Sequence, residues 1–223
     1  MKYHDKFYPD QYYHIFNHAV GNENLFRTEE NFFYFLKKYA HHIFPVVKTI
    51  AYNLLPNHFH FIIKIRSVET LIEHAQELVK FKNECITAGN VHSKQLIVFD
   101  ESKFNTHEFV IQQFSNLFSG YAQAINKQEK RRGALFIDYL KRKQIINESY
   151  LKNLITYVHF NAVHHGFCKK AEDWKYSSFQ IPLLKGKTKL EREIILQLFE
   201  TTDGYKQYHE DFKDLMDDDL EFI

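Results

Sequence analysis

The chain has 223 residues, of which 44% are hydrophobic and 17% aromatic, so it has enough apolar material for a globular core and is not a disordered protein. Its 7 glycines and 4 prolines argue against a linker-rich or repetitive protein. The formal net charge of +1 hides an asymmetry, because residues 191–223 carry 11 acidic and 3 basic side chains while the other residues are net basic. A basic body with an acidic end is compatible with a polyanionic partner.

No segment of the sequence predicts a membrane span or a secretory leader. The chain lacks the apolar run of about 18 residues that a transmembrane helix needs, and residues 1–16 lack the apolar core of a signal peptide. Cys85 and Cys168 are far apart and have neither metal-binding nor redox spacing, as expected for reduced thiols. We therefore expect a cytoplasmic protein with no membrane partner.

The first part of the chain predicts a strand, a helix and a hairpin. The expected elements are a strand over 12–20, a helix over 29–44 and two strands over 46–55 and 58–65. Thr28 is a suitable N-cap for the helix, and Pro45 is a stop signal. Pro56 and Asn57 predict the tight turn of the hairpin.

The second part predicts more helix and one further strand. The expected elements are a helix over 68–86, an amphipathic helix from His107, a short strand within 136–145, and a helix that starts at Asn147 or Ser149 and ends near Gly166. This order predicts a ferredoxin-like βαββαβ sandwich, an antiparallel sheet covered by helices on one face, with one extra helix. We expect one domain over 1–184 and an acidic helical appendage over 185–223.

Two histidines lie two residues apart on the last strand of the predicted hairpin. Residues at this spacing project from the same face of a strand, so His58 and His60 point together while Phe59 and Phe61 point to the other face. Two imidazoles placed in this way can bind one divalent cation. The plainer alternative is a pair of polar residues on a solvent-facing side, which is common in a chain with 14 histidines.

Tyr157 and Asn161 are neighbours on one face of the last predicted helix, because they are four residues apart. They flank its apolar stripe, from which the phenol can reach the sheet that bears the histidines. A phenol oxygen can act as a covalent nucleophile, and an amide oxygen can complete the ligand shell of a hard cation. The alternative is a tyrosine that packs and an asparagine near a helix end.

A basic stretch precedes this helix. Seven cationic side chains occur within 17 residues. They are Lys127, Lys130, Arg131, Arg132, Lys141, Arg142 and Lys143. Such a cluster suits contacts with DNA phosphates, and the alternative is an ordinary solvated surface.

Several segments, in this order, carry a resemblance to a known family. They are LPNHFHFII (55–63), SGYAQAINKQEKRRGALF (119–136), LKRKQI (140–145), YVHFNAVHHGF (157–167) and DWKYSSF (173–179). Over about residues 12–180 the sequence resembles the single-tyrosine HUH transposases, specifically the branch of REP-associated tyrosine transposases. The resemblance implies that His58 and His60 bind the metal, that Tyr157 is the nucleophile and that Asn161 is the third ligand. Ala162 stands where the family usually has proline, which we expect to affect the helix exit more than the chemistry.

The resemblance also implies an activity. The expected enzyme uses Mg²⁺ or Mn²⁺ to cleave and rejoin single-stranded DNA through a 5′-phosphotyrosine intermediate, at a hairpin or repeat sequence. Residues 1–184 would form the transposase domain. Some related transposases are dimers, so both a monomer and a homodimer stay open.

Two other functions fit parts of the sequence. One is a nucleic-acid-binding protein of the same fold without turnover, although such a protein would need neither the histidine pair nor Tyr157. The other is an unrelated metal-dependent hydrolase, which predicts a further Asp, Glu or His ligand beside the pair. Residues 53–68 contain no Asp or Glu.

Overall fold

The computed structural model describes residues 3–90, 95–137 and 140–215. In chain order the helices and strands are β1 (Tyr12–His18), α1 (Glu29–His42), β2 (Val47–Leu54), β3 (His58–Ile65), α2 (Val68–Thr87), α3 (Thr106–Gln128), β4 (Lys141–Ile145), α4 (Glu148–His164), α5 (Arg192–Phe199) and α6 (Thr202–Leu215). Within these residues, no helix is both long and apolar enough to cross a membrane.

The four strands form one antiparallel sheet in the order β2-β3-β1-β4. β1 pairs with β3 on one side and with β4 on the other, so β1 and β3 occupy the centre of the sheet. This strand order, with helices between β1 and β2 and between β3 and β4, is the ferredoxin-like arrangement. The fold predicted from the sequence is therefore confirmed.

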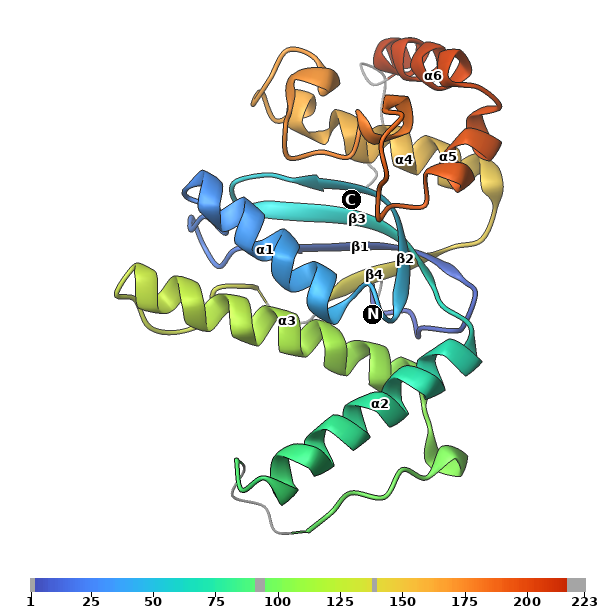
Figure 1. Cartoon of the computed structure of the whole chain (residues 1–223). Coiled ribbons are helices and arrows are strands. Elements are labelled where there is room, and N and C mark those ends of the chain that lie inside the picture. The colour runs from blue at the N-terminus through green and yellow to red at the C-terminus, as the bar shows by residue number, and fades with distance from the viewer. Residues whose placement is uncertain (1–2, 91–94, 138–139, 216–223) are drawn as a thin grey trace.

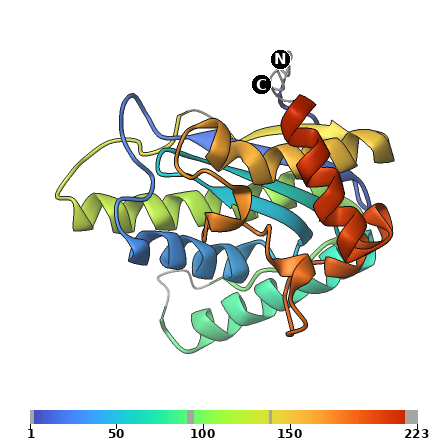
Figure 2. The ribbon, with the colours of Figure 1, turned by 90° about the horizontal axis from the view of Figure 1, so that it is seen from above.

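Helices cover both faces of this sheet. α1 and α3 lie against one face, and α4 lies against the other, with α5 beside α4 next to β2 and α6 on the outer side of α4 (Figure 1). Seen from above, α4 and α6 lie over the strands (Figure 2). α2 points away from the sheet at the lower end of the molecule (Figure 1). The extra helix expected from the sequence thus forms a third layer.

Each face of the sheet has its own apolar core. Phe59 and Phe61 of β3 pack with α1 and α3 in the larger cluster, as their alternation with the histidines predicts. On the other face, Ile62 of β3 packs with apolar residues of α4. The same cluster includes buried side chains of the C-terminal segment, such as Ile195 and Phe199 of α5. The acidic extension therefore shares a core with α4.

The ends of α4 follow the predicted signals. Asn147 is the N-cap, and its Oδ1 accepts a hydrogen bond from the backbone N–H of Tyr150 at 2.7 Å. Gly166 lies just beyond the helix with φ of 73°, a conformation that glycine adopts readily. β4 is shorter than the 136–145 segment predicted as a strand, because the described residues of this segment that precede Lys141 contribute only an isolated bridge from Phe136 to Ala19.

Candidate active site

The pairing of β1 with β3 gathers histidines on the face that α4 covers. The antiparallel register places His18 opposite His58 and Phe16 opposite His60, and paired residues share a face. The rings of His58 and His60 lie 5.2 Å apart between centroids and are perpendicular. His14 joins them from β1, since its ring centroid is 5.1 Å from that of His60.

α4 brings the predicted tyrosine and asparagine to the same place. The Tyr157 ring centroid is 6.1 Å from that of His60, and Asn161 Oδ1 is 2.9 Å from His58 Nε2. The helix is held in this position by Asn53 of β2, whose Nδ2 donates to the Val158 carbonyl oxygen at 2.8 Å. The structure thus brings the two candidate histidines of β3 together with Tyr157 and Asn161 of α4.

The two ring nitrogens of His58 have different partners. Nδ1 lies 2.8 Å from Asn57 Oδ1, and Nε2 lies 2.9 Å from Asn161 Oδ1. Burial lowers the pKa of His58 to about 4, so near neutral pH the ring is uncharged and has a single N–H. When Nδ1–H donates to Asn57, Nε2 presents a lone pair toward the Asn161 amide oxygen.

This arrangement fits a bound divalent cation. A nitrogen lone pair and an amide oxygen that face each other at 2.9 Å are both ligand atoms. Adjacent ligands of an octahedral ion with metal–ligand distances of about 2.1 Å lie roughly 3 Å apart. His58 and Asn161 are therefore suited to hold Mg²⁺ or Mn²⁺.

His60 is oriented by a second histidine. Its Nδ1 lies 3.0 Å from His14 Nε2, and both side chains are buried. Burial is the main cause that lowers the pKa of both rings, to about 3 for His14 and well below its usual value for His60. With Nδ1 occupied by His14, Nε2 is the His60 atom left for a cation. Sequence reasoning identified neither His14 nor Asn57, although the alternation of β1 could have placed His14 on this face.

Tyr157 is half-buried at the site. Burial raises the pKa of its phenol, and a hydrogen bond with the Asn161 side chain lowers it, with burial dominant. The phenol is therefore protonated near neutral pH and must lose its proton if it acts as a nucleophile. In the parts of the chain that the structure describes, no group of three or more His, Cys, Asp or Glu side chains is placed to hold a metal ion.

Two of the predicted cationic residues lie beside the histidines. In the β1–β4 register Lys141 is opposite Phe16 and Lys143 is opposite His14, so both lysines project from the face that bears the site. Lys141 Nζ lies 5.7 Å from the Phe16 ring centroid. β4 is the last strand of the sheet, and the N-terminal segment bonds to its outer edge, where the N–H of Arg142 donates to the Tyr3 carbonyl oxygen.

Arg142 points the other way. It is 7% exposed, and its guanidinium donates to the carbonyl oxygens of Asp5, Leu140 and His4. These bonds tie the N-terminal segment to β4. The sequence grouped Arg142 with the phosphate-binding residues, whereas the structure directs it inward, so we leave it out of the proposed DNA surface.

The remaining cationic residues lie in the last turn of α3 and just after it. Lys127, Lys130 and Arg132 are exposed, while Arg131 is held by hydrogen bonds to Asn126 Oδ1 and the Ala134 carbonyl oxygen. The segment after them is tied to the site end of β1, because the N–H of Ile137 donates to the His18 carbonyl oxygen at 2.9 Å. His18 in turn stacks on His58, with ring centroids 4.4 Å apart.

The chain thus has a ferredoxin-like sheet with a His-x-His strand under a tyrosine-bearing helix. The structure is similar to a solved REP-associated tyrosine transposase bound to a REP hairpin, with a TM-score of 0.54 and 14% sequence identity. The match covers 83% of this chain and 87% of the other. At this identity the likeness establishes the fold. No protein-family model matches the sequence, and no curated protein does.

Proposed function

We propose that this protein is a metal-dependent transposase or endonuclease that cleaves and rejoins single-stranded DNA through a 5′-phosphotyrosine intermediate. The observation that supports it most directly is the approach of Asn161 Oδ1 to His58 Nε2 at 2.9 Å, with Tyr157 one helical turn earlier beside His60. The candidate metal ligands and the candidate nucleophile therefore lie next to each other. The fold shared with a REP-associated tyrosine transposase supports the same proposal.

The chemistry follows from these side chains. The Tyr157 oxygen forms a bond to a backbone phosphorus while the bond from that phosphorus to the 3′ oxygen breaks. The phenol loses its proton, and the departing 3′ oxygen gains one, so the products are a 5′-phosphotyrosine and a free 3′-hydroxyl. When bound, Mg²⁺ or Mn²⁺ would neutralise the charge that develops on the phosphate. Attack by another 3′-hydroxyl on the phosphotyrosine reverses the step and joins two strands.

The proposed substrate is single-stranded or hairpin DNA. Lys141 and Lys143 flank the candidate active site on β4, and exposed Lys127, Lys130 and Arg132 lie at the end of α3 and just after it. These cations would contact phosphates, which fixes the register of the strand without reading its sequence. The proposed catalytic domain spans residues 1–184, with 185–223 as its extension.

A cleavage assay tests this function. The protein is mixed with labelled single-stranded oligonucleotides from the DNA that flanks its gene, with Mn²⁺ or with EDTA, and the products are separated on a denaturing gel. We expect a metal-dependent protein–DNA adduct that Tyr157→Phe abolishes. Tyr150→Phe, on the same helix, is the matched control and should retain the adduct.

The alternative functions predict other results. A binding protein without turnover would bind the oligonucleotides and give no adduct on any of them. A hydrolase that uses water would cleave with metal and would be insensitive to Tyr157→Phe. Although His14, His18 and His165 surround the pair, the first is engaged with His60, which disfavours a three-histidine hydrolase centre.

A further inference from the structure

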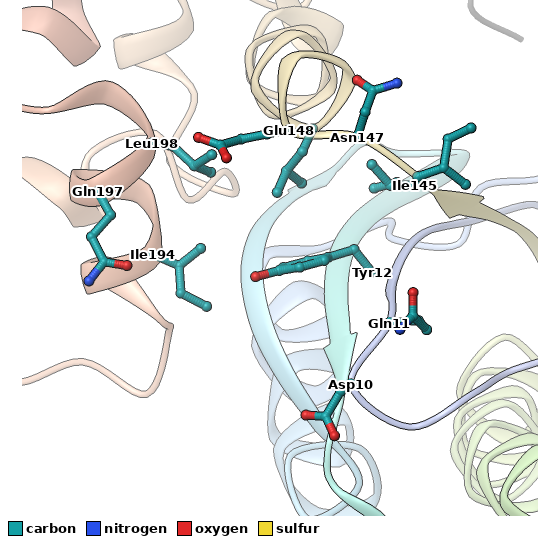
Figure 3. A pocket seen from close by; sticks show the side chains of 11 residues that line it. Asp10, Gln11, Tyr12, Ile145, Asn147, Glu148, Ile194, Gln197 and Leu198 are labelled. Atoms are coloured by element: carbon teal, nitrogen blue, oxygen red, sulfur yellow. The ribbon is translucent and has the colours of Figure 1, made fainter.

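A cavity of about 490 Å³ lies between the sheet, the start of α4 and α5. Figure 3 shows Tyr12 of β1 reaching into it, with Glu148 of α4 above and Ile194 and Gln197 of α5 opposite. This volume is in the range of pockets that bind small organic groups. Since α5 supplies one wall, the cavity exists only because the C-terminal extension packs against the body.

The cavity lies on the same face as the candidate active site. Tyr12 is two residues from His14 on β1, so the two side chains project together, roughly 7 Å apart along the strand. Along α4, Glu148 precedes Tyr157 by nine residues, or roughly 13 Å at the rise of an α-helix. A DNA strand held at Tyr157 could therefore place a nearby nucleotide at the cavity.

The charges of the cavity disfavour a phosphate group. Its lining includes the carboxylates of Asp10 and Glu148 and no Lys, Arg or His. Asp10 is partly balanced by Lys64, whose Nζ is 3.8 Å from Asp10 Oδ1. Glu148 is exposed and forms no salt bridge with any residue in the described ranges. The cavity thus favours a neutral group that donates hydrogen bonds.

The walls suit a flat ring. The Tyr12 ring offers a stacking surface, and Ile194 and Leu198 of α5 supply aliphatic contacts. Glu148 can accept from an exocyclic amine, and the Gln197 amide can donate and accept. Thymine fits poorly, because carbonyl oxygens flank its only ring N–H and would face the carboxylate.

We propose that this cavity binds one unpaired nucleobase with an exocyclic amino group, adenine, cytosine or guanine, from the strand held at the candidate active site. This inference rests on the proposed function and gives the C-terminal extension a role in choosing the DNA. Glu148 is the specificity-determining residue, and Tyr12 is the stacking platform. The phosphates on either side of the base stay outside, near Lys64 and Lys143.

The test compares two pyrimidine strands, which differ little in stacking. Full-length protein with Tyr157→Phe, in EDTA, is titrated into fluorescently labelled oligodeoxycytidylate and oligothymidylate of equal length, and the anisotropy gives each Kd. We expect the cytosine strand to bind about tenfold tighter, the effect of one hydrogen bond to a charged acceptor. Glu148→Ala should bring the two Kd values together.

The control is Glu193→Ala, which removes an acidic residue from the first turn of α5 as Glu148→Ala does from α4. Both variants remove one negative charge, so only Glu148→Ala should abolish the preference for cytosine. Gln197→Trp, at an exposed position, should fill the cavity and weaken binding of the cytosine strand.

Equal Kd values for the two strands, or a preference that survives both Glu148→Ala and Gln197→Trp, would overturn the inference and leave the proposed function standing. No binding of either strand at low salt, with the protein folded, would overturn both.

Discussion

At the scale of single residues, the candidate site depends on how two imidazoles are oriented. Each uses Nδ1 on a protein partner, Asn57 Oδ1 for His58 and His14 Nε2 for His60. Such hydrogen bonds fix the tautomer and the ring plane of a metal-binding histidine, and removing one typically weakens metal affinity 10- to 100-fold. His14 is therefore a positioning residue for His60.

This role predicts the effect of substituting His14. His14→Leu removes the acceptor for the His60 N–H and should weaken Mn²⁺ binding by about 10- to 100-fold. His14→Gln retains an amide oxygen that can accept, and should recover part of the affinity. Isothermal titration with Mn²⁺ measures this without any substrate. Equal affinities for His14→Leu and the unaltered protein would show that His14 does not orient a ligand.

The sequence indicated residues that share a face because of their spacing along one strand or helix. It missed residues that meet only when two strands pair. The alternation of β3 and the four-residue interval on α4 placed His58 with His60 and Tyr157 with Asn161 on shared faces, and the family resemblance then selected these residues as candidates. His14 could not be assigned to His60 because the register between β1 and β3 is a tertiary property. The sequence also grouped Arg142 with the DNA-binding residues. Its side chain is buried instead, because it donates a hydrogen bond to the N-terminal segment.

At the scale of elements, β4 divides its cationic residues between two faces. Lys141 and Lys143 face the candidate active site, and Arg142 between them faces inward, as strand alternation requires. Neighbours in a single basic run therefore have different roles. The lysines are expected to contribute to DNA affinity, and Arg142 to stability.

Salt dependence distinguishes these roles. Removing one cation that binds a phosphate of single-stranded DNA should lower the slope of log K against log salt by about 0.7, so Lys141→Ala with Lys143→Ala should lower it by roughly 1.4. Lys103→Ala, at a side chain that is 83% exposed near α3, is the control and should leave the slope unchanged. An unchanged slope in the double variant would remove β4 from the DNA surface.

A buried polar cluster attaches α6 to α4. His159 Nδ1 lies 3.0 Å from His209 Nε2, His159 Nε2 lies 2.8 Å from Ser178 Oγ, and the Tyr205 hydroxyl is 3.2 Å from His159 Nδ1. Burial lowers the pKa of His209 to about 4 and that of His159 well below its usual value. Both rings are neutral in the folded protein near pH 7 and resist protonation below it.

These pKa shifts determine how the stability of the protein changes with pH. Between the ordinary pKa of 6.5 and the folded value of about 4, the unfolded chain binds more protons at His209 than the folded protein does. The free energy of unfolding should therefore fall as the pH drops through this window, by up to about 3 kcal/mol for His209 alone. Urea titrations at about pH 7 and about pH 5 measure the fall. His209→Gln, which does not titrate, should reduce it, and an identical fall would refute the assignment.

At the scale of the whole molecule, the C-terminal extension belongs to the folded body. Ile195, Phe199, Tyr205 and Phe212 are buried in one cluster with α4 and Ile62 of the sheet. The excess of acidic residues in this segment also fits a tail that competes with DNA for the basic surface. The sequence could not show this packing, because the apolar residues of α5 and α6 pack with α4, with the sheet and with each other, and these contacts are tertiary.

Truncation tests this packing. Removal of residues 191–223 should expose the apolar side of α4 and destabilise the protein by several kcal/mol, since removing a large buried side chain costs about 2–5 kcal/mol. Thermal unfolding followed by circular dichroism should show a much lower Tm. A truncated protein with an unchanged Tm and tighter DNA binding at low salt would support the tail as a competitor instead.

The identity of the nucleophile tests the proposed function most directly. Adduct formed with Mn²⁺ and single-stranded DNA is digested with nuclease and trypsin, and the nucleotide-modified peptide is identified by mass spectrometry. The tryptic peptide 153–169 contains Tyr157 as its only tyrosine. We predict that the modification lies in this peptide and is absent in EDTA. A modification on a peptide without Tyr157, or one that forms equally without metal, would contradict the proposed site.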